Sequence, residues 1–191
     1  MDTLFVNAAF RDGSRSLALA ESYLELAGGE VEEIDLGHAP VAPLDARSLA
    51  VYNAAVAAHD FADPMFDVPR RFARADEIVI AAPFWNYSIP AALHDYLELV
   101  CTQGLSFDID ETGTYHGMCA ARRLTYITTA GGPIPEPDYA FGYVAHLARS
   151  FWDILEVRCY KAECLDVYGC DVEAALEAVR ERMRADVAAR R

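Results

Sequence analysis

The sequence predicts one α/β domain, a three-layer sandwich in which helices cover both faces of a five-stranded parallel sheet. Short apolar runs alternate with segments of helical periodicity, which is typical of a parallel sheet whose crossovers are helices. A length of 191 residues suits a single domain, which we place at residues 1–191. Strands connected in this way suit the order 2-1-3-4-5.

The amino-terminal segment reads as a strand, a loop and a helix. Residues 4–6 form an apolar run, and polar and glycine residues follow it up to Gly13. From Ser14 onward apolar residues recur at helical spacing, until Gly28 supplies a stop.

The next segment contains an edge strand and the centre of the sheet. Residues 31–36 alternate apolar and acidic side chains, as a half-buried edge strand does, and two prolines make residues 39–44 irregular. Helices are expected at residues 48–59 and 68–75. The run 78–82 is apolar without alternation, which predicts a central parallel strand covered on both faces.

The carboxyl-terminal half repeats the alternation. A helix is expected over residues 89–101 with Pro90 in its first turn, followed by a hairpin or lid within residues 105–118. The remaining expected elements are strands at residues 124–129 and 157–165, a helix at residues 139–152, and a last helix capped by Asp171.

Composition excludes several classes of protein. A hydrophobic fraction of 53% with 24% charged residues is that of a folded domain. The net charge of −14 repels nucleic acids and anionic lipid surfaces, so neither is expected as a partner. The start of the chain lacks a secretion signal and no apolar run reaches the roughly 18 residues of a membrane span, so we expect a cytoplasmic location.

The cysteines and histidines indicate no metal site. The five cysteines form no CxxC pair, and no histidine lies at zinc-finger spacing from them. An odd number of cysteines at such spacings also gives no disulfide framework. We therefore expect free thiols and no metal.

Ligands of such a sheet bind beyond the carboxyl ends of the strands, where the strand order reverses. The expected ends are residues 8–16, 83–87 and 129–133. Three loops of this sequence should therefore meet on one rim.

The first of these loops has no GxGxxG and no Walker pattern, which argues against a classical dinucleotide-binding site and against a nucleoside triphosphatase. It carries Ser14, Arg15 and Ser16 at the start of a helix, where unpaired amides and the positive end of the helix dipole favour a monoester phosphate. A purely structural alternative is that Ser14 only caps the helix.

The other two loops suit a planar heterocycle. Prolines stiffen the second loop, which presents two large aromatic side chains and the Asn86 amide. The third contains Gly131 and Gly132, which allow close approach to bare backbone. The alternatives are a hydrophobic plug over the core for the second loop and a flexible turn for the third.

Together these residues resemble the FMN-dependent NADH-azoreductase and NAD(P)H:quinone oxidoreductase family of flavodoxin-like proteins, over nearly the whole chain. The resemblance implies that Ser14-Arg15-Ser16 binds the flavin phosphate and that the two other loops hold the isoalloxazine ring. The residues it assigns to the cofactor in those loops are Pro83, Phe84, Trp85, Asn86, Tyr87, Thr129, Ala130, Gly131 and Gly132. The sequence departs from the pattern of that family at two positions. Ala8 stands where members often carry a serine, and Ala130 replaces an arginine or similar polar residue near the flavin, so the affinity for FMN or the choice of acceptor should differ.

The resemblance also implies a reaction: NADH or NADPH reduces FMN, which then reduces quinones, azo compounds or nitroaromatics in a ping-pong scheme. Flavin N5 performs the chemistry, so no catalytic side chain is assigned. A homodimer is implied, with each flavin pocket completed by the neighbouring chain. Phe107 and Tyr115 are candidates for an apolar substrate wall, or for dimer contact or loop packing. A flavodoxin-type electron carrier that serves protein partners is the alternative function.

Overall fold

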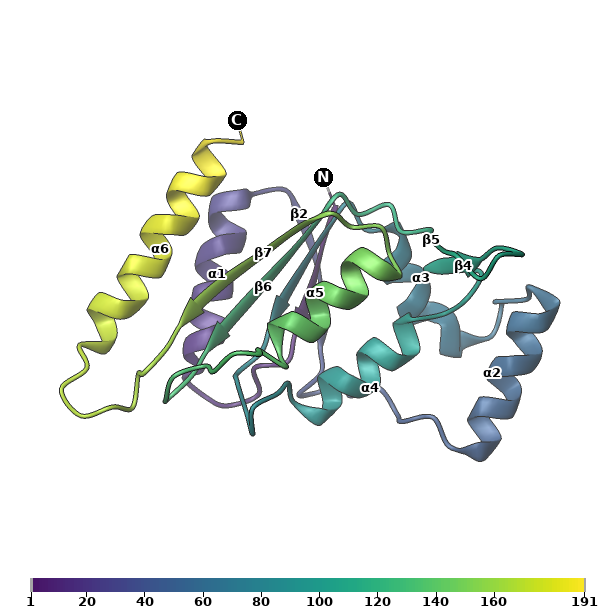
Figure 1. Ribbon diagram of the computed structural model, residues 1–191, viewed down its shortest axis with the longest axis horizontal. Helices are drawn as coiled ribbons and strands as arrows, with labels where there is room; N and C mark the ends of the chain where they lie inside the picture. The colour runs from purple at the N-terminus through teal and green to yellow at the C-terminus, as the bar shows by residue number, and fades with distance from the viewer. Residues whose placement is uncertain (1, 191) are drawn as a thin grey trace.

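The computed structural model describes residues 2–190 and contains a parallel sheet of five strands in the order β2-β1-β3-β6-β7 (Figure 1). The strands are β1 (Asp2–Asn7), β2 (Glu30–Asp35), β3 (Glu77–Ala81), β6 (Arg123–Thr129) and β7 (Glu156–Ala162). With the hairpin strands left aside, this is the predicted order 2-1-3-4-5, which is confirmed. All four neighbouring pairs in the sheet are parallel.

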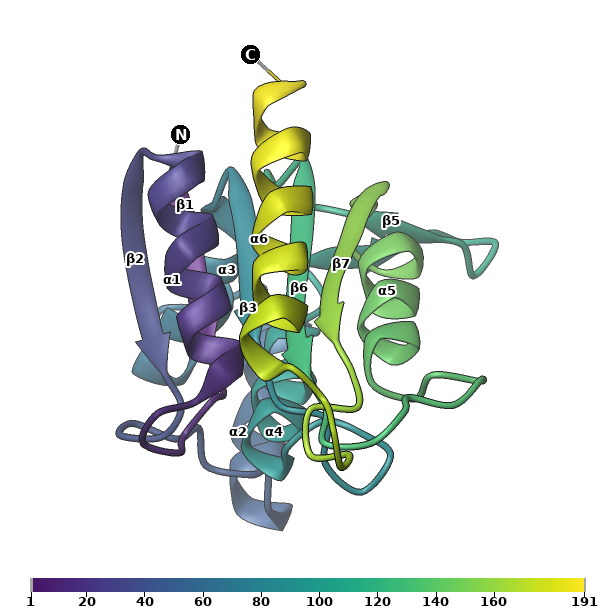
Figure 2. The same cartoon turned by 90° about the vertical axis from the view of Figure 1, so that its left-hand side faces the viewer.

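Helices cover both faces of the sheet, as predicted. Helices α1 (Arg15–Ala27) and α6 (Val172–Ala188) lie side by side on one face, in front of the sheet in Figure 2. The opposite face packs against the helices α3 (Asp67–Arg74), α4 (Ala91–Val100) and α5 (Phe141–Ser150). None of these helices, nor any other in residues 2–190, is long and apolar enough to cross a membrane.

Strand β3 is the central strand of the sheet and carries no exposed side chain. Ile78 and Ile80 point into the core under α3, α4 and α5, whereas Val79 and Ala81 point into the core under α1 and α6. Successive side chains of a strand face opposite sides, so an unbroken apolar run is what a strand buried on both faces requires.

Helix α2 (Ala46–Ala58) stands apart from these layers. None of its side chains is buried, although Leu49 and Val51 are apolar. Asp45 caps it and forms a reciprocal capping box with Ser48, so local hydrogen bonds define where the helix starts. A short 3-10 helix, Pro64–Phe66, connects α2 to α3.

The predicted hairpin is present as β4 (Phe107–Ile109) and β5 (Tyr115–Gly117), which pair antiparallel. The amide of Gly117 donates to Asp153 at 2.7 Å, just before β7 begins. The hairpin therefore lies toward the amino ends of the strands, as Figure 1 and Figure 2 both show. It does not cover their carboxyl ends.

Most predicted boundaries are off by one or two residues, and two of the differences have a clear physical reason. The last strand ends at Ala162 rather than at residue 165, because the amides of Cys164 and Leu165 donate to carbonyls of the loop after β6 instead of continuing a ladder. Pro90 is the residue before α4 rather than part of its first turn. Its extended backbone suits a cap position, since its missing N–H would have no helical acceptor there.

Candidate functional site

The loops that follow β1, β3 and β6 meet on one rim of the sheet, and backbone hydrogen bonds hold them together. The amide of Phe84 donates to the carbonyl of Thr129 at 3.1 Å, which joins the second loop to the third. The hydroxyl groups of Ser16 and Thr129 lie 2.8 Å apart and join the first loop to the third. The meeting of these loops, predicted from the strand order, is confirmed.

Two adjacent pockets open on this rim. The first, here called the inner pocket, has a volume of about 230 Å³ and lies between the loops after β1, β3, β6 and β7. Its lining consists of Ala9, Phe10, Arg11, Ser14, Arg15, Pro83, Phe84, Trp85, Thr129, Ala130, Gly131 and Asp166. Three of these side chains are charged, and the start of a helix forms one wall.

The second, here called the outer pocket, has a volume of about 410 Å³. It is lined by Phe84, Asn86, Tyr87, Ala130, Gly131, Gly132, Pro133 and Pro135, none of which is charged. The two pockets share Phe84, Ala130 and Gly131, so they adjoin along these residues. A ligand that spans both would have a charged end and a planar, mostly apolar end.

The inner pocket has the features of an anion site at the start of α1. Ser14 has an extended backbone, and its side-chain oxygen accepts from the amide of Leu17 at 3.4 Å. The amides of Arg15 and Ser16 lie in the same first turn, where a helix offers no internal acceptor. These amides and the positive end of the helix dipole favour a negatively charged group.

Ser16 differs from the other eleven predicted cofactor residues, because it lines neither pocket. Its side chain is fully buried, and its hydroxyl group is engaged with Thr129. In this structure Ser16 therefore holds two loops of the rim together, whereas Ser14 and Arg15 face the inner pocket.

The loop after β3 makes a two-residue turn with an unusual backbone. Trp85 and Ser88 exchange two backbone hydrogen bonds, at 3.0 and 2.8 Å. The two residues between them, Asn86 and Tyr87, have φ angles of 50° and 62°. Asparagine adopts such angles readily, but a tyrosine in the left-handed region is strained. The turn places both side chains at the outer pocket.

Because this strain is local, Tyr87→Gly is expected to raise the stability of the protein. Asn-Gly is a preferred pair for this type of turn, and removing the left-handed tyrosine relieves about 1 kcal/mol. Tyr87 is exposed and its main ring contact is an edge-on approach to Phe84 at 6.2 Å, so little packing is lost. Urea unfolding measures the change, and Tyr87→Ala, which keeps the strain, is the matched control. Equal stabilities of the two variants would contradict this account.

Sequence reasoning missed four residues of the inner pocket, Ala9, Phe10, Arg11 and Asp166. Phe10 contacts Trp85 edge-on at a centroid distance of 6.2 Å, and Arg11 lines the pocket beside it. Asp166 comes from the loop after β7 and pairs with Arg15 at 2.8 Å. The signal that could have found Asp166 is its place after the last strand, since the carboxyl end of that strand lies on the same rim.

Phe107 and Tyr115 lie away from both pockets. Their rings are 5.8 Å apart and both pack on Phe151, at 4.7 and 4.6 Å. Phe107 is buried and Tyr115 is exposed. Within one chain they form an aromatic cluster between the hairpin and the end of α5, and they line no wall of the rim pockets.

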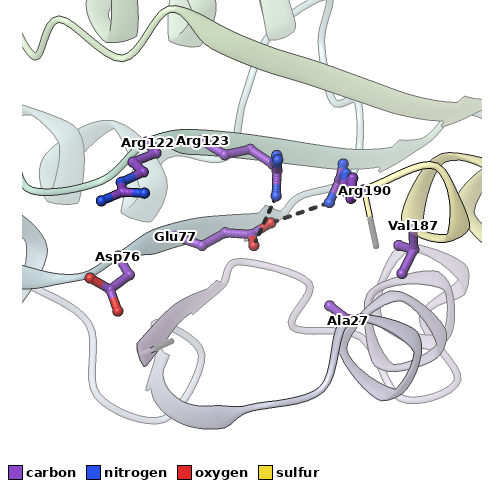
Figure 3. A pocket seen from close by; sticks show the side chains of 7 residues that line it. All are labelled: Ala27, Asp76, Glu77, Arg122, Arg123, Val187 and Arg190. Carbon is purple, nitrogen blue, oxygen red and sulfur yellow. Dashed lines mark ion pairs between the residues drawn. The ribbon is translucent and has the colours of Figure 1, made fainter.

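A larger cavity of about 520 Å³ lies at the opposite end of the sheet (Figure 3). At its centre Glu77, 1% exposed, forms ion pairs with Arg123 at 3.5 Å and Arg190 at 3.9 Å, drawn as dashed lines in the figure. The hydroxyl group of Tyr23 donates to the same carboxylate at 2.5 Å. These groups are directed at one another, so they connect α1, the starts of β3 and β6, and the segment that follows α6.

Comparison with known proteins agrees with this fold. The chain is similar to the FMN-dependent NADH:quinone oxidoreductase 2 of Clostridium acetobutylicum, with 36% identity over 118 residues. That match spans 60% of this chain and 58% of the relative. A second relative, the FMN-dependent NADH:quinone oxidoreductase of Clostridium beijerinckii, is 35% identical over 115 residues, 60% of this chain and 58% of that protein.

Among solved structures, an FMN-dependent NADH-azoreductase from Bacillus anthracis in complex with FMN superposes with a TM-score of 0.82 at 21% identity. The superposition covers 98% of this chain and 97% of the azoreductase. The NAD(P)H:quinone oxidoreductase from Methanothermobacter marburgensis gives a TM-score of 0.72 at 18% identity, covering 98% and 97% of the two chains. At these identities the superpositions support the fold.

The sequence pattern of the Flavodoxin_2 family, described as a flavodoxin-like fold, matches residues 1–187. This match covers nearly the whole chain and agrees with the parallel sheet and its strand order. The chain belongs to the Flavodoxin_2 family of proteins with a flavodoxin-like fold.

Proposed function

We propose that this protein is an FMN-dependent oxidoreductase that passes two electrons from NADH or NADPH to quinones, azo compounds or nitroaromatics. The observation that carries the proposal is the pair of adjoining rim pockets, one charged at a helix start and one uncharged. The names of the relatives support the same activity. Because the match spans just over half of their length, the activity is proposed for this chain rather than transferred to it.

The residues of the inner pocket fit the phosphate of FMN. The first-turn amides of α1 and the Ser14 hydroxyl group supply donors, and Arg15 supplies a positive charge beside them. Gly131 fits as well, because a Cβ atom there would collide with the carboxylate of Asp166 and narrow the pocket. Ser16 would act indirectly, through its contact with Thr129.

The outer pocket fits the isoalloxazine ring. Asn86 offers a side-chain amide to a polar edge, while Phe84 and Pro133 offer apolar surface. The carbonyls of Gly131 and Gly132 are occupied by the amides of Asp166 and Cys164, which fixes the orientation of the turn. We propose that the amides of the two glycines stabilise negative charge at one edge of the ring, as backbone amides do in an oxyanion hole.

When bound, FMN supplies a hydride acceptor and a two-electron donor, so both half-reactions can use one site in a ping-pong scheme. The protein has to bind the cofactor, leave one face open to planar partners and keep the ring oriented. Tyr87 and Trp85 are exposed beside the pockets and provide stacking surface for such partners. No side-chain acid or base is assigned a catalytic role.

We further propose a homodimer. Helix α2 exposes Leu49 and Val51, and a groove of about 390 Å³ lies between α2, α4 and α5. The aromatic cluster of Phe107, Tyr115 and Phe151 borders the same region, since Phe151 also lines the groove. Contact with a second copy would cover this apolar surface and would give Phe107 and Tyr115 their role at the neighbour's site. We also propose that the protein is located in the cytoplasm.

The purified protein is expected to bind FMN and then to oxidise NADH rapidly when menadione or an azo dye is present. The visible absorption of oxidised flavin should disappear on anaerobic addition of NADH and return on addition of the acceptor. Initial rates at several acceptor concentrations should give the parallel double-reciprocal lines of a ping-pong scheme. A stable semiquinone with slow NADH oxidation would instead indicate an electron carrier, and a protein that stays colourless after addition of FMN would contradict both.

A further inference from the structure

The charged groups of the inner pocket are already paired with one another. Nη1 of Arg15 lies 2.8 Å from Oδ1 of Asp166, and the two residues are 151 positions apart in the sequence. The Asp166 side chain is 70% exposed and the Arg15 side chain 31% exposed, so both groups remain accessible to a ligand. Both line the inner pocket. An anion entering there therefore meets a guanidinium group that already has a carboxylate partner.

The loop that carries Asp166 is fixed to the glycine turn by three consecutive backbone hydrogen bonds. The amides of Cys164, Leu165 and Asp166 donate to the carbonyls of Gly132, Ala130 and Gly131, at 3.0, 3.1 and 2.9 Å. The Asp166 carboxylate lies against the bare backbone of Gly131, where a Cβ atom would collide with it. These hydrogen bonds fix the backbone of Asp166 beside the pocket, and the attraction of Arg15 orients its exposed carboxylate.

We propose that Asp166 is a counter-anion that an incoming phosphate has to displace from Arg15, and that it sets the preference of this pocket between phosphorylated and unphosphorylated flavins. This inference rests on the proposed function. Three charged side chains line the inner pocket, Arg11, Arg15 and Asp166, so their summed charge is +1. Neutralising Asp166 makes it +2. A phosphate dianion gains from that change, whereas a neutral ligand does not.

The size of the effect follows from Coulomb's law. Repulsion between one carboxylate and a dianion several ångströms away in a water-exposed pocket corresponds to about tenfold in affinity. An exposed ion pair contributes little to folding, so losing the Asp166 charge should leave the fold intact. The repulsion is screened by salt, with a Debye length of about 10 Å at 0.1 M and about 3 Å at 1 M. The preference for phosphate should therefore depend on ionic strength.

The test measures the dissociation constants of FMN and of riboflavin, which lacks the phosphate, by flavin fluorescence with the full chain. Asp166→Asn is expected to bind FMN about tenfold more tightly at low salt, with riboflavin unchanged, and the gain should shrink at about 1 M salt. Asp166→Glu keeps the charge and should behave like the wild type. Glu181→Gln removes one negative charge from the exposed surface of α6 and is the matched control for net charge.

The outcomes separate this inference from the proposal on which it rests. If wild type binds FMN but Asp166→Asn binds it equally well or more weakly, Asp166 is not a displaced counter-anion and the inference is overturned. It is overturned as well if riboflavin gains the same affinity, or if Glu181→Gln reproduces the gain. If neither the wild type nor any variant binds either flavin, the proposed function itself fails, and the proposed role of Asp166 fails with it.

Discussion

Ser14→Asp is expected to lower the affinity for FMN about a hundredfold while leaving the protein folded. Ser14 is the N-cap of α1 and lines the inner pocket, so its side chain lies where we place the phosphate. Aspartate is as good an N-cap as serine and interacts favourably with the helix dipole. The variant therefore keeps the helix but brings a negative charge to a site that has to accept a dianion.

Ser14→Asn is the matched control, because asparagine has the shape of aspartate, caps helices equally well and carries no charge. We expect its FMN affinity to stay within a few-fold of the wild type. The measurement is the dissociation constant from flavin fluorescence, together with the melting temperature of each variant. If both variants lose FMN equally, the effect is steric, and if neither does, the phosphate does not lie at the start of α1.

The largest expected loss of stability comes from Glu77→Ala, at about 3–5 kcal/mol in the free energy of unfolding. Glu77 is 1% exposed and faces two arginines, as Figure 3 shows. The hydroxyl group of Tyr23 donates to it at 2.5 Å, and the hydroxyl group of Thr125 donates to Tyr23 at 3.1 Å. Removing the carboxylate leaves the Tyr23 hydroxyl group without its acceptor and takes away the buried negative charge that faces Arg123 and Arg190.

Burial, together with the hydrogen bond to Glu77, also raises the pKa of Tyr23, which keeps the phenol protonated as a donor. The matched control is Glu156→Ala, because Glu156 accepts from the same Arg123 at 2.7 and 2.8 Å but is 39% exposed. Its loss should be about 1 kcal/mol or less. Urea unfolding of both variants gives the comparison. Equal losses would show that burial of the Glu77 carboxylate is not what makes it important.

Much of the candidate site was predictable because it depends on where strands end. The apolar run of β3 and the glycines after β6 identified two loops, and the parallel arrangement required their carboxyl ends to share a rim with the start of α1. Eleven of the twelve predicted cofactor residues line one of the two pockets, Ser16 being the exception. Whether they bind FMN stays a prediction.

The remaining features depend on contacts between distant parts of the chain. Ser16 and Ser14 are both hydroxyl residues at a helix start, yet only the tertiary position of Thr129 turns Ser16 away from the pockets. Asp166 comes 151 residues after its partner Arg15, and no periodicity connects the two. For Phe107 and Tyr115 the sequence left a substrate wall, a dimer contact and loop packing open. The hairpin that carries them lies toward the other end of the sheet, so within one chain they line neither rim pocket.

By itself the sequence determined the alternation of strands and helices, the order of the sheet and the loops that form its ligand rim. Hydrophobic periodicity is a local property that marks each strand and helix, and helical crossovers between parallel strands allow few topologies. Only the tertiary structure decided which side chains of those loops face a pocket, which pair with each other, and that Glu77 and Arg190 meet at the opposite end. The reason is that side-chain direction and ion pairing depend on packing between segments far apart in the chain, which no local pattern encodes.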